Sequence, residues 1–119
     1  MRKRFLFLDD TEERHEHFDR ICEALSVDVW HVYTVKQAID RLKSDDRFDC
    51  VFLDHDLDER DDWNGWVVAK FIAVHMDRGN QPRNVVIHSW NPAGADDMES
   101  VLLDSGYRNV RRVEFSFGG

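Results

Sequence analysis

Residues 4–10 read RFLFLDD, a nearly continuous apolar run that ends in two aspartates. The run predicts a strand over residues 4–9 that is covered on both faces, because a strand with one solvated face would alternate polar and apolar side chains. Residues 51–56 (VFLDHD) and 85–91 (VVIHSWN) also pass from apolar side chains into polar ones. The carboxyl ends of parallel strands share one edge of a sheet, so these polar side chains are expected to converge there.

The rest of the chain alternates between strand and helix patterns. The predicted strands are residues 4–9, 27–33, 48–54, 84–89 and 110–117, with a helical segment between each pair. Right-handed crossovers and short loops then predict a single α/β domain over residues 1–119. We expect a flavodoxin-like, doubly wound parallel sheet of five strands in the order 2-1-3-4-5. Ligands of such folds bind at the switch point between the first and third strands.

Each predicted helix follows a residue that can cap it. The expected capping residues are Asp10, Thr34, Asn64 and Asn91, in chain order. The third helix is expected to run without interruption to Arg78, before Gly79.

Composition excludes several classes of partner. The net charge of −8 and the pI of about 5.1 give no broad attraction to duplex DNA or to anionic membranes. No apolar run reaches the roughly 20 residues that a membrane span requires. Cys22 and Cys50 lie within apolar patterns, so we expect free thiols and a cytoplasmic location.

The first and third predicted strands bring three carboxylates to one edge. Asp9, Asp10 and Asp54 are suited to Mg²⁺ or Mn²⁺, because hard cations prefer oxygen ligands. Like charges at one edge also raise one another's pKa, and a cation relieves that repulsion. The alternative is that Asp10 only caps a helix and Asp54 merely ends a strand.

Two histidines and two smaller polar residues accompany the aspartates. Imidazole titrates near neutrality, so His55 and His88 could supply the acid and the base that cleave a phosphodiester, in either assignment. Ser89 and Asn91, at the start of the fourth helix, could orient phosphate oxygens. The alternative is a packed His88, a solvated His55 and an ordinary turn. The histidines that we expect to have no catalytic role are His15, His17, His31 and His75.

Several residues resemble the response-regulator receiver domain. They are the acidic pair Asp9 and Asp10, Asp54 at the phospho-acceptor position, Gly65 and Ala69 in the following helix, and Ser89. Receivers carry a lysine at the end of the fifth strand, whereas Lys70 is the last lysine here, and Arg111 or Arg112 could replace it only in part.

The two histidines, which are additions to the receiver pattern, occur in segments that resemble a second family. LDHDL at residues 53–57 and IHSWNPAGA at residues 87–95 are similar to the cyclic-phosphate-processing receiver-like domains, a receiver-derived family that lacks the last helix. The resemblance implies activity on a cyclic phosphate and a fold without that helix.

Three hypotheses remain open from the sequence. The first is a metal-dependent phosphoesterase that acts on a cyclic phosphate, which is a small phosphorylated ligand such as a cyclic nucleotide or a 2′,3′-cyclic RNA end. The second is a signalling receiver in which Asp54 accepts a phosphoryl group. The third is a non-catalytic module that binds a phosphorylated ligand. A homodimer is also possible, through the apolar sheet face that a missing last helix would leave open.

Overall fold

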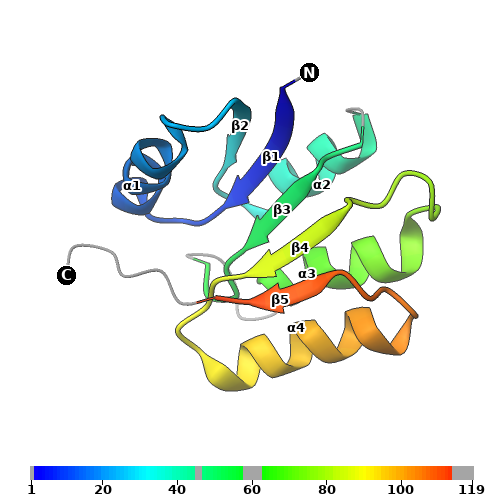
Figure 1. The fold of residues 1–119 in the computed structure, drawn as a ribbon. Coiled ribbons are helices and arrows are strands. Elements are labelled where there is room, and N and C mark those ends of the chain that lie inside the picture. The colour runs from blue at the N-terminus through cyan, green and yellow to red at the C-terminus, as the bar shows by residue number, and fades with distance from the viewer. Residues whose placement is uncertain (1, 45–46, 58–62, 114–119) are drawn as a thin grey trace.

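The fold is a five-stranded parallel sheet with helices on both faces (Figure 1). The computed structural model describes residues 2–44, 47–57 and 63–113. The strands are β1 (Lys3–Leu8), β2 (Val27–Val32), β3 (Cys50–Leu53), β4 (Asn84–Ile87) and β5 (Val110–Arg112). The helices are α1 (Glu12–Cys22), α2 (Val35–Ser44), α3 (Gly65–Lys70), the π-helix η1 (Phe71–His75) and α4 (Pro92–Asp104).

The strand order β2-β1-β3-β4-β5 confirms the order predicted from the sequence. All neighbouring strands are parallel, and Leu8, Leu53 and Ile87 are aligned in register across the three central strands. Residues that follow these positions therefore emerge at the same edge. This alignment is what brings the polar ends of β1, β3 and β4 together.

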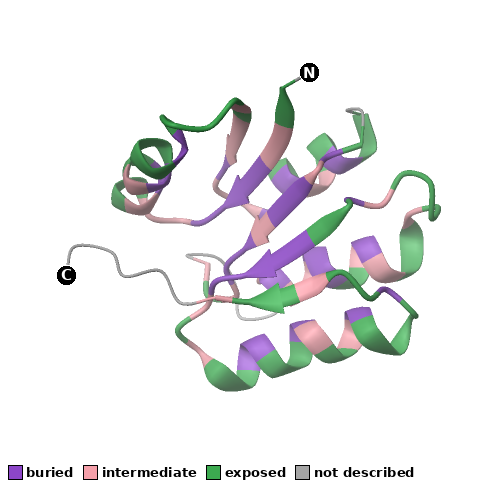
Figure 2. Cartoon of the chain, in the orientation of Figure 1, coloured by how far each residue is buried: buried purple, intermediate pink, exposed green. Residues whose placement is uncertain are grey.

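Two cores lie on opposite faces of the sheet. Helix α1 covers one face, where Phe7 packs on Phe18 at a ring-centroid distance of 4.2 Å. Helices α2, α3 and α4 cover the other face, which holds the larger core (Figure 1). Figure 2 shows the buried residues concentrated in the strands and on the inner sides of these helices.

The first helix begins differently from the prediction. Thr11, not Asp10, occupies its N-cap position, and the Thr11 backbone N–H donates to Asp9 Oδ1 at 2.8 Å. Asp10 is therefore released from capping. The predicted caps Asn64 and Asn91 are confirmed, because their side chains accept from the backbone N–H groups of Trp66 and Gly94.

The third helix is not uniform. It changes from α-helical to π-helical geometry at Phe71 and ends at His75, three residues before the predicted end. The periodicity of apolar residues does not distinguish these two geometries over so short a segment. A π-helical turn widens the backbone, and such turns are frequent at functional sites.

Other expectations have mixed outcomes. Cys22 and Cys50 are both buried and free. In the described residues, no helix has the length and apolarity needed to cross a bilayer.

Strand β5 ends at Arg112, and residues 114–117 of the predicted strand lie outside the described residues. Phe5 and Phe52 are half-buried on the α1 face, and the homodimer through this face remains a prediction.

Adjacent leucines of α4 provide a test of this packing. Leu102 is completely buried and Leu103 is 38% exposed. We expect Leu102→Ala to lower the free energy of unfolding by about 2–5 kcal/mol, because it leaves a cavity in the larger core. Leu103→Ala should cost about 0.5 kcal/mol in the same urea titration. Equal losses would contradict this assignment of the inner side of α4.

Candidate active site at the carboxyl edge of the sheet

Three aspartates meet at the carboxyl ends of β1 and β3. Each of Asp9, Asp10 and Asp54 offers a carboxylate oxygen, and these oxygens lie within 4.8 Å of one another. Asp9 and Asp54 are almost fully buried, whereas Asp10 is accessible to solvent. The structure thus brings together the three residues that the sequence assigned to a metal.

The two buried carboxylates are electrostatically unfavourable when both are ionised. Burial raises the pKa of Asp54 to about 8, and the negative charge of Asp9 adds to the shift. Burial also raises the pKa of Asp9, although the Thr11 N–H and Arg14 oppose that change. Asp54 Oδ2 is buried and accepts no hydrogen bond from the described residues. An oxygen in this condition is suited to a cation.

Arg14 provides a positive charge at the cluster. Its Nη1 lies 3.4 Å from Asp9 Oδ2 and 3.5 Å from Asp54 Oδ2. The residues expected to replace the receiver lysine in part were Arg111 and Arg112, whereas no role was expected for Arg14. Arg112 instead forms ion pairs with Asp96 and Glu99 on α4. The position of Arg14 in the first turn of α1, five residues after Asp9, was the available signal.

His15, for which no catalytic role is expected from the sequence, also lies next to the site. It is buried, and its Nε2 lies 2.8 Å from the backbone oxygen of Asp9. Its Nδ1 lies 2.6 Å from His31 Nδ1, and His31 Nε2 lies 2.8 Å from Asp19 Oδ1. This chain of contacts between α1 and β2 holds the end of β1 in place. His15 therefore positions the backbone of Asp9. Because it is buried, it cannot contact a ligand at the site.

His88 lies beneath the aspartates. Its ring stacks on Phe7 with an interplanar angle of 7°, and its Nδ1 lies 3.7 Å from Asp9 Oδ2. Burial is the main reason that its pKa falls to about 3, with the charge of Arg14 contributing. His88 is therefore a neutral imidazole at physiological pH.

His55 occupies a more open position. Its Nδ1 lies 2.8 Å from Asp56 Oδ1, and the Asn91 side-chain amide donates to the same oxygen at 3.2 Å. The hydrogen bond from His55 is the largest cause of the lowered pKa of Asp56. Burial opposes it, and the Asn91 hydrogen bond adds to the lowering. An ionised Asp56 orients the imidazole, because it accepts a hydrogen bond from Nδ1–H and leaves Nε2 as the nitrogen with a free lone pair.

Two glycines allow the starts of α3 and α4 to pack tightly against Asp54 and His55. A Cβ atom at Gly65 would lie 2.0 Å from the backbone oxygen of Asp54, and the Gly65 N–H donates to His55 O at 3.0 Å. A Cβ atom at Gly94 would lie 2.4 Å from Cγ of His55. The starts of α3 and α4 can therefore approach Asp54 and His55 only without side chains at these positions.

Ser89 and Asn91 shape the turn into α4. Ser89 Oγ accepts from the Asn91 backbone N–H at 3.1 Å, and Asn91 Oδ1 caps the helix at Gly94. Both predicted phosphate ligands thus have internal partners. Ser89 also borders a cavity of about 340 Å³ that Trp90, Pro92 and Arg112 help to line.

The comparisons with known proteins agree with this geometry. The sequence profile of the cyclic-phosphate processing receiver domain matches residues 4–104. The chain belongs to this family. No curated protein matches the chain. The match includes the three aspartates, Arg14 and both histidines of the site, whereas Arg112 lies beyond it.

Solved structures show the same fold at low sequence identity. The receiver domain of a putative LuxO repressor protein from Vibrio parahaemolyticus is 19% identical, with a TM-score of 0.69 over 98% of this chain and 82% of that one. A CheY-like receiver domain from Methylobacillus flagellatus is 17% identical, with a TM-score of 0.71 over 98% and 88%. A phosphorylated cyanobacterial phytochrome response regulator is 17% identical, with a TM-score of 0.75 over 99% and 84%.

The donor set of this family member fits a divalent cation. Receiver domains bind Mg²⁺ at an acidic pocket, and the corresponding strand ends here carry the cluster of Asp9, Asp10 and Asp54. The buried Asp54 Oδ2 without a hydrogen bond supports the fit. All three ligands are carboxylates, which match the preference of Mg²⁺ for oxygen.

The raised pKa of Asp54 gives the metal-free protein a definite dependence on pH. Its folded-state pKa of about 8 lies above the ordinary value of 3.8, so the stability contributed by the protonated form is present below 3.8 and is lost progressively as pH rises from 3.8 to about 8. Asp54→Asn removes this loss. We therefore expect the metal-free variant to unfold at a higher temperature than the parent chain at pH 8.5, and the difference to shrink toward pH 5.

The same variant should lose its response to Mg²⁺. At a concentration one hundred times its Kd, Mg²⁺ should stabilise the parent chain by about 2.7 kcal/mol. Asp97→Asn, at an exposed position on α4, is the matched control and should keep the full response. A Mg²⁺ response that survives Asp54→Asn would place the ion elsewhere.

Proposed function

We propose that this chain is a metal-dependent phosphoesterase that opens a cyclic phosphate, such as a cyclic nucleotide or a 2′,3′-cyclic RNA end. The observation that carries the proposal is the juxtaposition of the acidic cluster with an imidazole oriented by a carboxylate. His55 belongs to the segment directly after Asp54, and Asp56 holds its Nδ1. The family to which the chain belongs is described by cyclic-phosphate processing, which supports the same substrate class.

The residues have separate tasks in this reaction. Asp9, Asp10 and Asp54 would hold Mg²⁺ or Mn²⁺, which when bound supplies polarisation of a phosphoryl oxygen. His55 Nε2 takes a proton from the attacking water while oxygen bonds to phosphorus. The phosphorus–oxygen bond to the sugar then breaks, and the released oxygen takes a proton from solvent at the open edge. The product is a phosphomonoester with a free hydroxyl group.

The two histidines are not equivalent in this scheme. His88 is buried and neutral, so a role in positioning Asp9 suits it better than proton exchange with a substrate. The cavity beside Ser89 could receive the nucleoside part of the substrate, where Trp90, which is 60% exposed, offers a surface for stacking. Asn91 orients Asp56 through its side-chain amide and caps α4 through its Oδ1.

The direct test is a phosphorus NMR assay with Mg²⁺ or Mn²⁺ and a panel of 2′,3′-cyclic, 3′,5′-cyclic and cyclic-oligonucleotide substrates. We expect a new phosphomonoester signal from the parent chain and none from Asp54→Asn. His55→Ala should reduce turnover about 10²-fold or more, as loss of a general base does. His75→Ala, at an exposed position, is the matched control and should leave turnover unchanged.

Two outcomes of this assay would overturn the proposal. Ligand retention without product, at confirmed metal occupancy, would indicate a binding module instead. Turnover that is equal in His55→Ala and His75→Ala would remove His55 from the mechanism.

The close approach of Gly94 to His55 allows a second test. Gly94→Ala should displace the imidazole, because the new methyl group would lie 2.4 Å from His55 Cγ. Alanine favours a helix over glycine by about 1 kcal/mol, so the variant should still fold. We expect turnover of a substrate confirmed by NMR to fall about tenfold or more, with Mg²⁺ affinity little changed. Unchanged turnover with shifted His55 ring resonances would contradict the assigned role.

A phospho-accepting receiver is the second candidate. Asp54 Oδ2 accepts no hydrogen bond from the described residues, and Arg14 Nη1 lies 3.5 Å from it, as a cation that could neutralise an aspartyl phosphate. Stable labelling of Asp54 by acetyl phosphate, lost in Asp54→Asn, would support this function. Absence of labelling together with turnover of a cyclic phosphate would exclude it in favour of the enzyme.

A further inference from the structure

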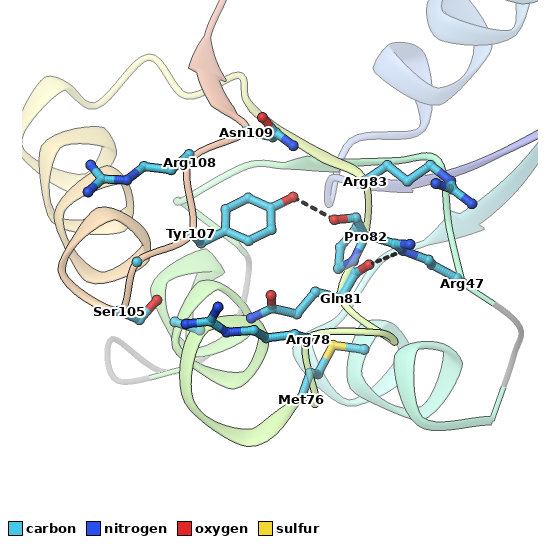
Figure 3. Close-up of a pocket in the computed structure, with 12 residues that line it drawn as sticks. Arg47, Met76, Arg78, Gln81, Pro82, Arg83, Ser105, Tyr107, Arg108 and Asn109 are labelled. Carbon is cyan, nitrogen blue, oxygen red and sulfur yellow. Dashed lines mark hydrogen bonds between the residues drawn. The ribbon is translucent and has the colours of Figure 1, made fainter.

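A second polar cavity lies at the opposite edge of the sheet. It has a volume of about 400 Å³ and is lined by the connections that enter β3, β4 and β5 (Figure 3). These connections lie at the amino ends of the strands, whereas the aspartates follow the carboxyl ends. The cavity is therefore separate from the candidate active site, and its occupant need not be the substrate.

The walls of this cavity are fixed by hydrogen bonds between segments distant in sequence. The Tyr107 hydroxyl donates to the backbone oxygen of Pro82 at 2.7 Å, and Arg47 Nε donates to the backbone oxygen of Gln81 at 2.7 Å (Figure 3). The Gln81 side-chain amide donates to Ile72 O, in the π-helix, at 2.9 Å. A cavity held in this way keeps its shape without a ligand, which lowers the cost of binding one.

The lining is strongly cationic. The four arginines that line the cavity are Arg47, Arg78, Arg83 and Arg108. No Asp or Glu from the described part of the chain lines it. Of these arginines, only Arg83 forms an ion pair with a described residue, at 3.3 Å from Asp49. This concentration of positive charge is unexpected in a chain with a net charge of −8.

The arginines are placed in two ways. Figure 3 shows Arg78 extending toward Ser105, with the Arg47 guanidinium beside Gln81. Arg83, which pairs with Asp49, and Arg108 point away from the centre, and both residues are exposed. Guanidinium groups around one cavity repel one another, and a bound anion would relieve that repulsion.

We propose that this cavity binds a small anion with two or more phosphoryl groups. A guanidinium group presents a planar fork of N–H donors that matches phosphate oxygens in bidentate pairs. The volume of about 400 Å³ lies within the range of small-molecule sites. The net charge of −8 disfavours a long nucleic acid, which would contact much of the remaining surface, but does not exclude a compact anion.

Pyrophosphate is the probe for this site. Isothermal titration would use the full chain in a metal-free buffer with chelator, so that the aspartate cluster holds no cation that could bind phosphate. We expect saturable binding of pyrophosphate. The affinity should fall about tenfold or more in Arg78→Gln/Arg108→Gln, because this variant loses the charge-assisted hydrogen bonds from two guanidinium groups to the phosphate oxygens. Arg20→Gln/Arg41→Gln, which removes two exposed charges elsewhere, should change the affinity less than about twofold.

Several results would overturn the proposal. They are no saturable binding of pyrophosphate at millimolar concentration, equal weakening by the two double variants, or citrate binding as tightly as pyrophosphate. Loss of binding in Asp54→Asn but not in Arg78→Gln/Arg108→Gln would place the anion at the carboxyl edge instead.

A comparison of ATP with pyrophosphate then identifies the source of the phosphoryl groups. Tighter binding of ATP supports a nucleotide, and tighter binding of pyrophosphate supports an inorganic anion. Failure of the cyclic-phosphate assay would not affect either result, because the inference does not depend on the proposed function.

Discussion

The structure is organised around mutual repulsion between carboxylates at the end of a buried sheet. Parallel pairing of β1 with β3 forces Asp9 and Asp54 to emerge side by side, in a place where water cannot screen them. The fold compensates in part with the Thr11 N–H and the Arg14 guanidinium. Because the compensation is partial, the resting chain retains a preference for a further cation.

The depth of each group at this edge decides its chemistry. His88 and Asp9 belong to the interior, where a charged imidazole would be expensive. His88 stacks on Phe7 and lies beside Asp9, which ties it to the core. His55 and Asp56 belong to the loop above them, within reach of solvent. Two histidines that look equivalent in the sequence thus differ in burial, and the difference arises from position along the strand axis.

Much of the fold could be predicted from the sequence, because strand order and helix starts depend on local patterns and short connections. The meeting of Asp9, Asp10 and Asp54 followed from strand direction alone. The position of Arg14 could not be predicted in this way, since it depends on where a long side chain turns within the site. The π-helix Phe71–His75 was missed because a change in helical pitch leaves the same apolar spacing over one turn.

The separation of acidic and basic groups along the strands makes the molecule electrically polar. The carboxylate cluster lies at one end of the strand axis and the arginine-lined cavity lies at the other. A molecule with such a dipole rotates in the field of a charged partner before the two touch. Dissolved divalent cations and dissolved polyanions would therefore meet opposite ends of the same small protein, and the two encounters need not compete for space.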